Sequence, residues 1–244
     1  MDSPIPTSST RRRTLIVTAG VLVALAAAGS FAYRVGHYAR LIQAGSITRS
    51  DLAFLSNYTP SAVASALSSG TTSEATDRAS APALGAPDAK VTIVEFADFA
   101  CPFSRASSFT MRSLAAKYGD RIRYAYRDFP LGELHPDALG ASIAASCAGT
   151  QGKFWEYHDK LYLSQSDLGA ARLKALAREA NLDLVAFDAC VADPSVRTAV
   201  LEDYQAGLEA GVEGTPTFFI NGTMIPGAIP EDILDGLIER ALAQ

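Results

Sequence analysis

Residues 91–104 read VTIVEFADFACPFS, and this stretch decides the fold. Its first half is dominated by β-branched and aromatic residues, which is typical of a buried strand. Its second half begins a helix, because Pro102 suits the first helical position and apolar residues follow at helical spacing. The sequence therefore predicts a strand, a short turn and a helix that starts beside Cys101.

A cysteine at the start of a helix is well placed for chemistry. The first N–H groups of a helix have no partner within it, and the helix dipole favours an anion there. The same setting favours the thiolate over the thiol, and the thiolate is the form that attacks disulfides. The alternative for Cys101 is a small buried hydrophobic side chain, but the position at the helix start favours a nucleophile.

The bulk composition limits the function classes. The chain has 244 residues, of which 48% are hydrophobic, and this is enough for one packed domain and a tail. Its net charge of -5 gives no basic surface for nucleic acid. Its three cysteines are an odd number, which in an exported protein suggests one disulfide and one free thiol.

The N-terminal region predicts export. Residues 1–13 are polar and end in three arginines, and residues 14–32 carry no charge. As a helix, that uncharged stretch would span roughly 28 Å, close to the thickness of a bilayer's hydrocarbon core. The arginines predict a cytoplasmic N-terminus and an exported remainder. Two alternatives remain, an uncleaved transmembrane signal anchor and a cleaved signal peptide.

A tether follows in the sequence. Residues 33–89 are predicted to form a juxtamembrane segment and a flexible linker. The part from residue 58 onward is rich in Ser, Thr, Ala, Pro and Gly and cannot bury enough apolar surface to fold. The folded domain is therefore predicted over residues 90–244.

The rest of the chain continues the α/β pattern. Residues 121–127 alternate in the manner of a strand, and two short strands flank the turn at Asn221 and Gly222. A last helix is predicted over 230–242. The helical patterns between the second strand and the hairpin cover residues 138–149, 152–163, 168–179, 184–191 and 195–210.

The Cys-Pro-aromatic motif after an acidic strand, and a Gly-Thr-Pro turn before a later apolar strand, resemble the DsbA-like thiol-disulfide oxidoreductases of the thioredoxin superfamily. The resemblance covers residues 90–244 and implies an α/β thioredoxin fold with a helical insertion at about residues 133–211. Family members usually carry a second cysteine three positions after the first. This chain has Ser104 there, so a mixed disulfide on Cys101 must be resolved by an external thiol.

The resemblance also implies roles for other residues. Glu95 matches the buried acid of the superfamily, which relays a proton, and a desolvated carboxyl suits that work. Asp98 could share this role, although a loop carboxylate is the simpler interpretation. A hydrogen-bonded or solvated carboxylate without a catalytic role is the alternative for both residues.

The substrate-binding residues implied by the resemblance are Phe103, Thr215 and Pro216. Phe103 would modulate the helix terminus, and Ser104 could hydrogen-bond a thiolate. Thr215 would precede a cis proline and offer its backbone to an extended substrate beside the cysteine. An ordinary trans proline in a turn is the alternative, because few X-Pro bonds are cis.

Cys147 and Cys190 lie in the helical block, and the resemblance implies that they form a structural disulfide. Such a bridge would close a loop of about 44 residues and contribute roughly 4 kcal/mol. Two buried free thiols are the alternative. The scattered cysteines and histidines show no metal-ligand spacing, so neither a metal nor another cofactor is predicted.

Residues 151–158 and His135 are two further candidates for a functional role. Residues 151–158, QGKFWEYH, resemble another family segment, and their aromatic side chains are predicted to pack the insertion onto the core. His135 follows the second strand, where it could approach the active site. A histidine in a loop is more often a surface or capping residue, and that interpretation is favoured.

These observations predict an exported, membrane-tethered enzyme that exchanges disulfides on protein cysteines through Cys101. Its partners would be cysteine-containing exported polypeptides, an external thiol or membrane redox partner, and the membrane. It would lie in the bacterial cell envelope, anchored in the inner membrane with its domain outside the cytoplasm, or free in the periplasm after cleavage. The alternatives are a polypeptide-binding module with impaired redox chemistry and, less favoured, a glutathione-dependent transferase or isomerase.

Overall fold

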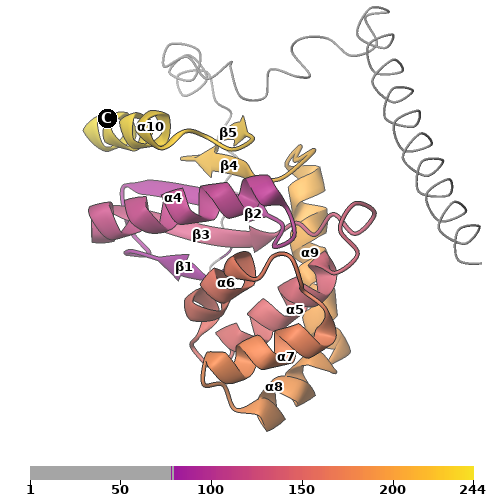
Figure 1. Cartoon of the computed structure of the whole chain (residues 1–244). Helices are drawn as coiled ribbons and strands as arrows, with labels where there is room; N and C mark the ends of the chain where they lie inside the picture. The colour runs from indigo at the N-terminus through magenta and orange to yellow at the C-terminus, as the bar shows by residue number, and fades with distance from the viewer. Residues whose placement is uncertain (1–77, 79) are drawn as a thin grey trace, which may run out of the picture. The chain divides into compact units, whose positions relative to one another are not determined.

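The computed structural model describes residue 78 and residues 80–244, which form a sheet flanked by helices (Figure 1). The strand order is β1-β3-β2-β4-β5. The strands are β1 Ala83–Leu84, β2 Val91–Ala97, β3 Ile122–Asp128, β4 Thr217–Ile220 and β5 Thr223–Pro226. The helices are α4 Pro102–Tyr118, the 3-10 turn η2 Gly119–Arg121, α5 Ala138–Gly149, α6 Phe154–Leu163, α7 Ala170–Glu179, α8 Leu184–Val191, α9 Pro194–Glu209 and α10 Glu231–Ala243.

The central strand β2 lies between a parallel and an antiparallel neighbour. It pairs in parallel with β3, from Val91 opposite Ile122 to Ala97 opposite Asp128. On its other side it pairs antiparallel with β4. Every residue of β2 but one is buried, which explains its continuous apolar sequence. Because β2 and β3 run in parallel, their carboxyl ends meet at one edge of the sheet, and the site lies there.

The predicted hairpin at the end of the sheet is present. β4 and β5 pair antiparallel from Ile220 opposite Thr223. The two turn residues, Asn221 and Gly222, have φ angles of 46° and 82°. A two-residue turn of this hand requires positive φ at both positions, and Asn and Gly tolerate it best.

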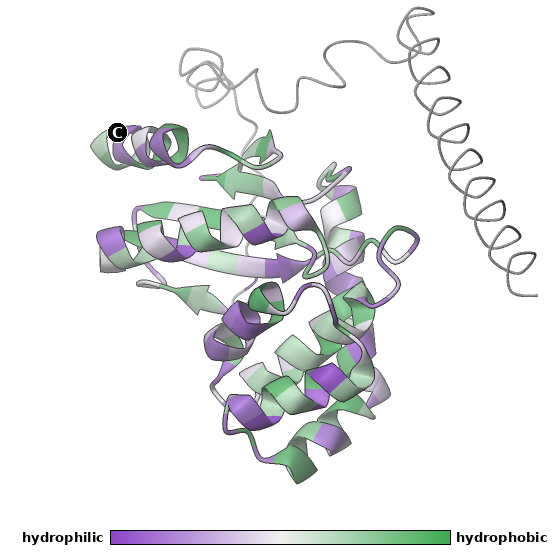
Figure 2. Ribbon diagram, viewed as in Figure 1, coloured by the Kyte–Doolittle hydropathy of each residue, from purple (hydrophilic) through white to green (hydrophobic). Residues whose placement is uncertain are grey.

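One face of the sheet is covered by α4 and α10. A buried cluster between them includes Met111 and Leu114 from α4 and Leu237 and Ile238 from α10. The strand residues in this cluster are apolar or aromatic, and β4 and β5 beside α10 are largely green in Figure 2, the colour of hydrophobic residues. This packing fixes the axis of α4, and therefore the direction in which its first turn points at the sheet edge.

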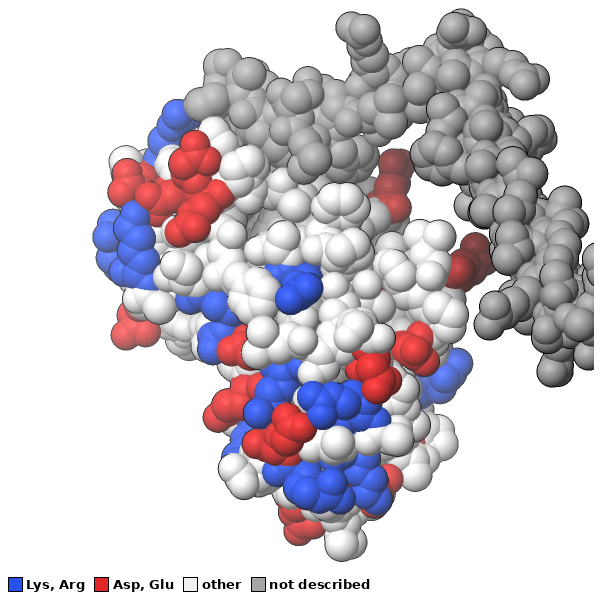
Figure 3. Space-filling view, viewed as in Figure 1, with Lys and Arg blue, Asp and Glu red and all other residues white. Residues whose placement is uncertain are grey.

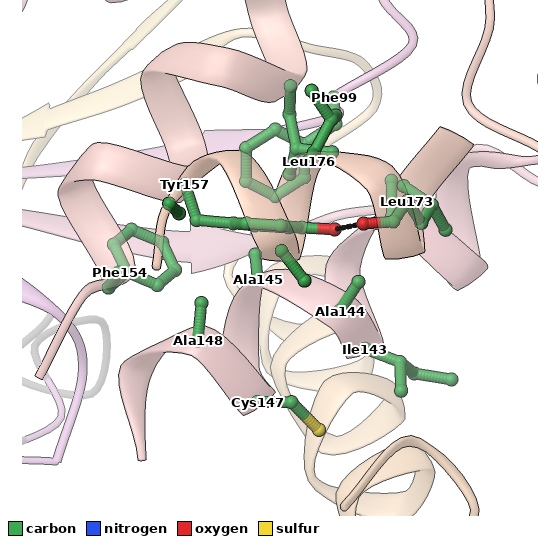
Figure 4. Packing of buried hydrophobic residues seen from close by; sticks show 14 of the residues in the cluster. Phe99, Ile143, Ala144, Ala145, Cys147, Ala148, Phe154, Tyr157, Leu173 and Leu176 are labelled. Carbon is green, nitrogen blue, oxygen red and sulfur yellow. Dashed lines mark hydrogen bonds between the residues drawn. The ribbon is translucent and has the colours of Figure 1, made fainter. Parts of the chain in front are cut away.

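The helical insertion predicted between β3 and β4 consists of α5 to α9 and has its own core (Figure 4). Tyr157 is fully buried in that core, and its hydroxyl donates to the carbonyl of Leu173 at 2.8 Å. Cys147 on α5 and Cys190 on α8 are joined by a disulfide with an S–S distance of 2.03 Å. The insertion is thus a packed unit rather than an extended loop.

Aromatic rings join the insertion to the sheet, as the sequence predicted for residues 151–158. The ring of Trp155 on α6 lies 5.2 Å from that of Tyr124 on β3. The buried ring of His158 lies 5.0 Å from that of Tyr162 and 5.7 Å from that of Phe99. Phe99 belongs to the turn before α4, so these contacts bring α6 against the segment that carries Cys101.

The folded domain begins earlier than the predicted boundary at residue 90. β1 pairs antiparallel with β3, and Ala81 just before it is buried. Arg78 lies 3.0 Å from Asp203 on α9. The linker prediction for residues 33–89 is therefore wrong at its end, because a two-residue strand is too short to show in a Ser- and Ala-rich sequence.

The predicted transmembrane span, residues 14–32, lies outside the described residues. Among the helices that the structure describes, none is both long enough and apolar enough to cross a bilayer.

Candidate active site

Cys101 occupies the N-cap position of α4. It has an extended backbone, with φ -78° and ψ 123°, and Pro102 follows at the start of the helix. Its N–H donates to the carbonyl of Asp98 at 3.0 Å, and its own carbonyl accepts from Arg105 at 3.1 Å. The residue is 5% exposed. The turn and the helix therefore hold the sulfur at the helix N-terminus, where a negative charge is favoured.

The cysteine thiol contacts the second segment predicted for the site. Its Sγ donates to the carbonyl oxygen of Thr215 at 3.3 Å, across a separation of 114 residues. The Thr215–Pro216 peptide bond is cis. β4 starts at the next residue, Thr217, and pairs with β2, so the sheet itself brings these two segments together.

The two residues predicted beside Cys101 differ in exposure. Phe103 is 53% exposed on the first turn of α4, whereas Ser104 is fully buried. The hydroxyl of Ser104 accepts from the N–H of Asp98 at 3.4 Å. Ser104 therefore supports the turn before the helix, and the apolar Phe103 ring is available to a binding partner.

Glu95 is fully buried in β2, six residues before Cys101. The hydroxyl of Tyr124 donates to its Oε2 atom. Burial raises the pKa of Glu95 to about 8, although the Tyr124 hydrogen bond opposes this shift. The carboxyl is consequently protonated at neutral pH. Burial raises the pKa of Tyr162 well above its usual value, and the nearby Glu95, Asp98 and Cys101 add to the shift.

Asp98 connects the turn of Cys101 to the loop that follows β3. Its Oδ1 accepts from Ala100 N–H at 2.7 Å. Its Oδ2 accepts from Leu131 N–H at 2.9 Å and lies 2.8 Å from Nδ1 of His135. His135 thus reaches the edge of the site through a buried carboxylate. The sequence favoured a surface or capping residue at this position, because the loop that carries it has no periodic pattern.

Gln165, which the sequence did not indicate, also reaches this turn. Its Nε2 donates to the carbonyl of Phe99 at 2.9 Å and to that of Cys101 at 2.8 Å. It comes from the turn after α6, 64 residues beyond Cys101. A lone glutamine in a polar turn carries no sequence signal of such a contact.

Among residues 78 and 80–244, there is no group of three His, Cys, Asp or Glu side chains that could hold a metal ion. The arrangement consists of one free thiol at a helix N-terminus, a backbone carbonyl beside it and a buried carboxyl below. Such an arrangement can attack a disulfide and hold the product covalently.

This fold and site define a thioredoxin-like protein with a helical insertion between β3 and β4. The sequence model of the family described as "Thioredoxin" matches residues 77–240, and the chain belongs to that family. This confirms the resemblance that the motifs indicated.

The curated relatives are longer than this chain. It is 38% identical over 159 residues to the Na(+)/H(+) antiporter NhaA 1 of Salinispora arenicola, a match that covers 65% of this chain and 24% of the antiporter. The match to NhaA 3 of Salinispora tropica has the same identity and coverage. The chain therefore matches only about a quarter of these relatives.

Solved structures share the fold over most of their length. A thioredoxin-like oxidoreductase from Silicibacter pomeroyi superposes with a TM-score of 0.64 and 26% identity, covering 71% of this chain and 99% of that protein. The catalytic domain of Proteus mirabilis ScsC gives 0.62 and 22%, covering 76% and 99%.

Proposed function

We propose that this protein is a thiol-disulfide exchange enzyme that acts on protein cysteines through Cys101 alone. One observation carries the proposal: the chain's free sulfur lies at the start of α4, 3.3 Å from the carbonyl that precedes Pro216. The chain's other two cysteines are bonded to each other. The similarity to the Silicibacter pomeroyi oxidoreductase supports the same class of reaction.

The chemistry takes place in two exchanges. The Cys101 thiolate attacks one sulfur of a substrate disulfide, forms a mixed disulfide with it, and expels the other sulfur as a thiolate. An external thiolate then attacks the mixed disulfide and frees Cys101. Each step breaks one S–S bond and forms another, so the enzyme itself is neither oxidised nor reduced. Isomerisation and exchange are therefore favoured over net oxidation of a dithiol.

Glu95 and Ser104 complete the catalytic set. The carboxyl of Glu95, with its pKa raised to about 8 by burial, holds a proton near neutral pH and can release it to a neighbouring base. Ser104 has no thiol with which to displace the substrate, and its buried hydroxyl faces the N–H of Asp98. The absence of a resolving thiol makes the mixed disulfide long-lived.

The surface around Cys101 suits an apolar polypeptide. Phe103 is 53% exposed, and Leu134, on the loop held by Asp98, is 73% exposed. Charged side chains gather over the insertion and beside the end of α10, whereas the face at the start of α4 carries few (Figure 3). An extended chain could lie along Thr215 and Pro216 with its disulfide above Cys101.

We place the enzyme in the cell envelope. The basic and apolar N-terminal sequence supports export and a membrane anchor over residues 14–32, and the paired Cys147 and Cys190 suit an oxidising compartment. The substrates would be exported polypeptides with cysteines. The external thiol would be a small thiol or a membrane redox partner.

Turnover of insulin disulfides with glutathione tests this function. The full chain is expected to accelerate insulin reduction, and Cys101→Ala is expected to abolish the acceleration. Cys147→Ala with Cys190→Ala provides the control, because it removes the other two sulfurs and should retain turnover below its melting temperature. Activity that survives Cys101→Ala would contradict the proposal.

The missing second thiol also favours another candidate, a polypeptide-binding module without redox turnover. Exposed Phe103 and Leu134 would then hold an unfolded chain, and Cys101 would be dispensable. The insulin assay separates the two candidates. The binding module predicts no acceleration, together with suppressed aggregation of the reduced insulin chains by both the wild type and Cys101→Ala. A glutathione-dependent transferase is the least favoured candidate.

A further inference from the structure

We propose that Gln165 is a positioning residue that sets the direction in which the Cys101 sulfur attacks a bound substrate. This inference rests on the proposed exchange reaction and assigns a role in it to the helical insertion. The two hydrogens of the Gln165 Nε2 atom point in different directions within one plane. They bind two carbonyls, at 2.9 Å on Phe99 and 2.8 Å on Cys101, and so fix one carbonyl relative to the other.

The two peptide groups that flank the Cα atom of Cys101 determine where its side chain points. The group on the N-terminal side is held by the hydrogen bond from Cys101 N–H to the carbonyl of Asp98. The group on the C-terminal side carries the carbonyl that Gln165 binds, together with the helical N–H of Arg105. The glutamine therefore completes the restraint on the Cα–Cβ bond of the nucleophile.

The glutamine itself comes from a well-supported turn. Asp167 N–H donates to the carbonyl of Ser164 at 2.9 Å, and Arg172 donates to the Ser164 hydroxyl at 2.9 Å. The preceding helix α6 contacts β3 through the ring of Trp155 on Tyr124 and through the Tyr162 hydroxyl, 3.1 Å from that of Tyr126. A side chain on such a rigid support can transmit the geometry of the insertion to the turn of Cys101.

The direction of the Cys101 sulfur affects the rate of attack most when the substrate is also held in a fixed orientation. Exchange proceeds through three sulfur atoms in line, and a misplaced reacting atom loses rate even when binding is unchanged. A peptide held along Thr215 and Pro216 cannot reorient to meet a displaced thiolate. A small free disulfide can approach from any open direction. Loss of Gln165 should therefore slow the reaction with a held peptide more than the reaction with a free disulfide.

The test is a single-turnover reaction of the full chain with a short apolar peptide whose one cysteine is bonded to thionitrobenzoate. Attack by Cys101 forms the peptide mixed disulfide and releases the coloured thionitrobenzoate anion. Gln165→Met keeps the length of the side chain and removes both donors. It is expected to lower the maximal rate by about tenfold, with the half-saturating peptide concentration unchanged. Its rate with free dithiobis(nitrobenzoic acid) should remain close to that of the wild type.

Gln151→Met is the matched control. The side-chain amide of Gln151 also makes two hydrogen bonds to backbone. Its Nε2 donates to the carbonyl of Asp183 at 3.1 Å, and its Oε1 accepts from the N–H of Asp183 at 2.8 Å. It lies within the insertion and does not contact the turn of Cys101. This variant should lose comparable thermal stability and react with the peptide at the wild-type rate.

Gln165→Glu adds a readout that a purely structural role would not move. Its carboxylate repels the two carbonyls, whereas the protonated carboxyl regains one donor. The rate of this variant relative to the wild type should therefore recover as the pH falls toward the ordinary range of a carboxyl group.

Three outcomes would overturn the role of Gln165. They are a wild-type maximal rate in Gln165→Met, an effect confined to the half-saturating concentration, and an equal loss in Gln151→Met. If the wild type did not react with the peptide at all, the proposed exchange function itself would fail, and this role would fail with it.

Discussion

The Sγ atom of Cys101 lies 3.3 Å from the carbonyl oxygen of Thr215, 114 residues away in the sequence. One residue follows the central strand β2, and the other precedes its antiparallel neighbour β4. The pairing of β2 with β4 places the nucleophile and the backbone beside it at one end of the sheet. The order of the strands therefore creates the site. The site contains a single thiol, and this limits the reactions that it can complete.

Restoring a second thiol should release trapped substrates. Ser104→Cys puts a sulfur one helical turn from Cys101, where it can attack the mixed disulfide and expel the substrate thiol. The lifetime of a purified peptide adduct should fall by more than about tenfold, because the second attack becomes intramolecular. Ser104→Ala is the control and should retain the adduct. An adduct on Ser104→Cys as persistent as that of the wild type would show that geometry, not the missing thiol, limits release.

The buried acid makes the stability of the fold depend on pH. Glu95 has an ordinary pKa of 4.5, which burial raises to about 8 in the folded chain. Between these values the unfolded state binds fewer protons, so the free energy of unfolding contributed by this group falls as the pH rises. Glu95→Gln should remove this loss and be more stable than the wild type by roughly 4 kcal/mol at pH 8, where the folded carboxyl is half ionised.

Urea unfolding at a series of pH values measures this difference. Asp128, whose pKa is raised to about 8 chiefly by burial and then by Asp203, gives the same slope to both proteins. The difference between the two curves therefore isolates Glu95. Parallel curves for wild type and Glu95→Gln would contradict the buried, neutral carboxyl.

Two arginines on one carboxylate differ in burial and should differ in their contribution to stability. Arg127 and Arg78 each lie 3.0 Å from Oδ1 of Asp203, but the Arg127 side chain is 4% exposed and that of Arg78 is 37% exposed. Arg127→Met should lower the free energy of unfolding by about 3–5 kcal/mol, because it removes the buried one of the two arginines that pair with the buried Asp203 carboxylate. Arg78→Met should cost about 1 kcal/mol or less. Equal losses in denaturant unfolding would refute this ranking.

A close approach of α9 to the sheet requires a glycine. A Cβ atom on Gly207 would lie 2.6 Å from the ring of Phe129 and 3.0 Å from that of Phe96. Gly207→Ala should therefore destabilise the fold by about 1–3 kcal/mol through overpacking. The control is Gly236→Ala on α10, where a Cβ would meet no atom within 4 Å. That change should stabilise the helix by about 0.5–1 kcal/mol, and a thermal melt that reversed this order would contradict the packing.

Periodicity and turn chemistry predicted most of the fold. The alternation in β3, the buried run in β2 and the Asn221–Gly222 turn each carry a local signal that tertiary packing reinforces. The predicted helices of the insertion agree with α5 to α9 within about two residues at their ends. β1 was missed because its two residues owe their strand conformation to pairing with β3, which no local pattern encodes.

The centre of the site could be predicted, but its supports could not. Cys101 and Pro216 carry motifs, and the resemblance supplied their relationship. Gln165 and His135 contact the site through single side chains from loops, at sequence distances of 64 residues from Cys101 and 37 from Asp98. Such contacts follow from the packing of the insertion and leave no repeating pattern in the sequence.

The central claim is that one thiol holds the substrate and needs an external thiol to release it. The most direct measurement is the intact mass of the full chain after mixing with a peptide disulfide and removal of excess reagent. We expect one added peptide, mapped to Cys101, which persists until glutathione is supplied and then disappears. A chain that gains no peptide, or that releases it without added thiol, would contradict the account.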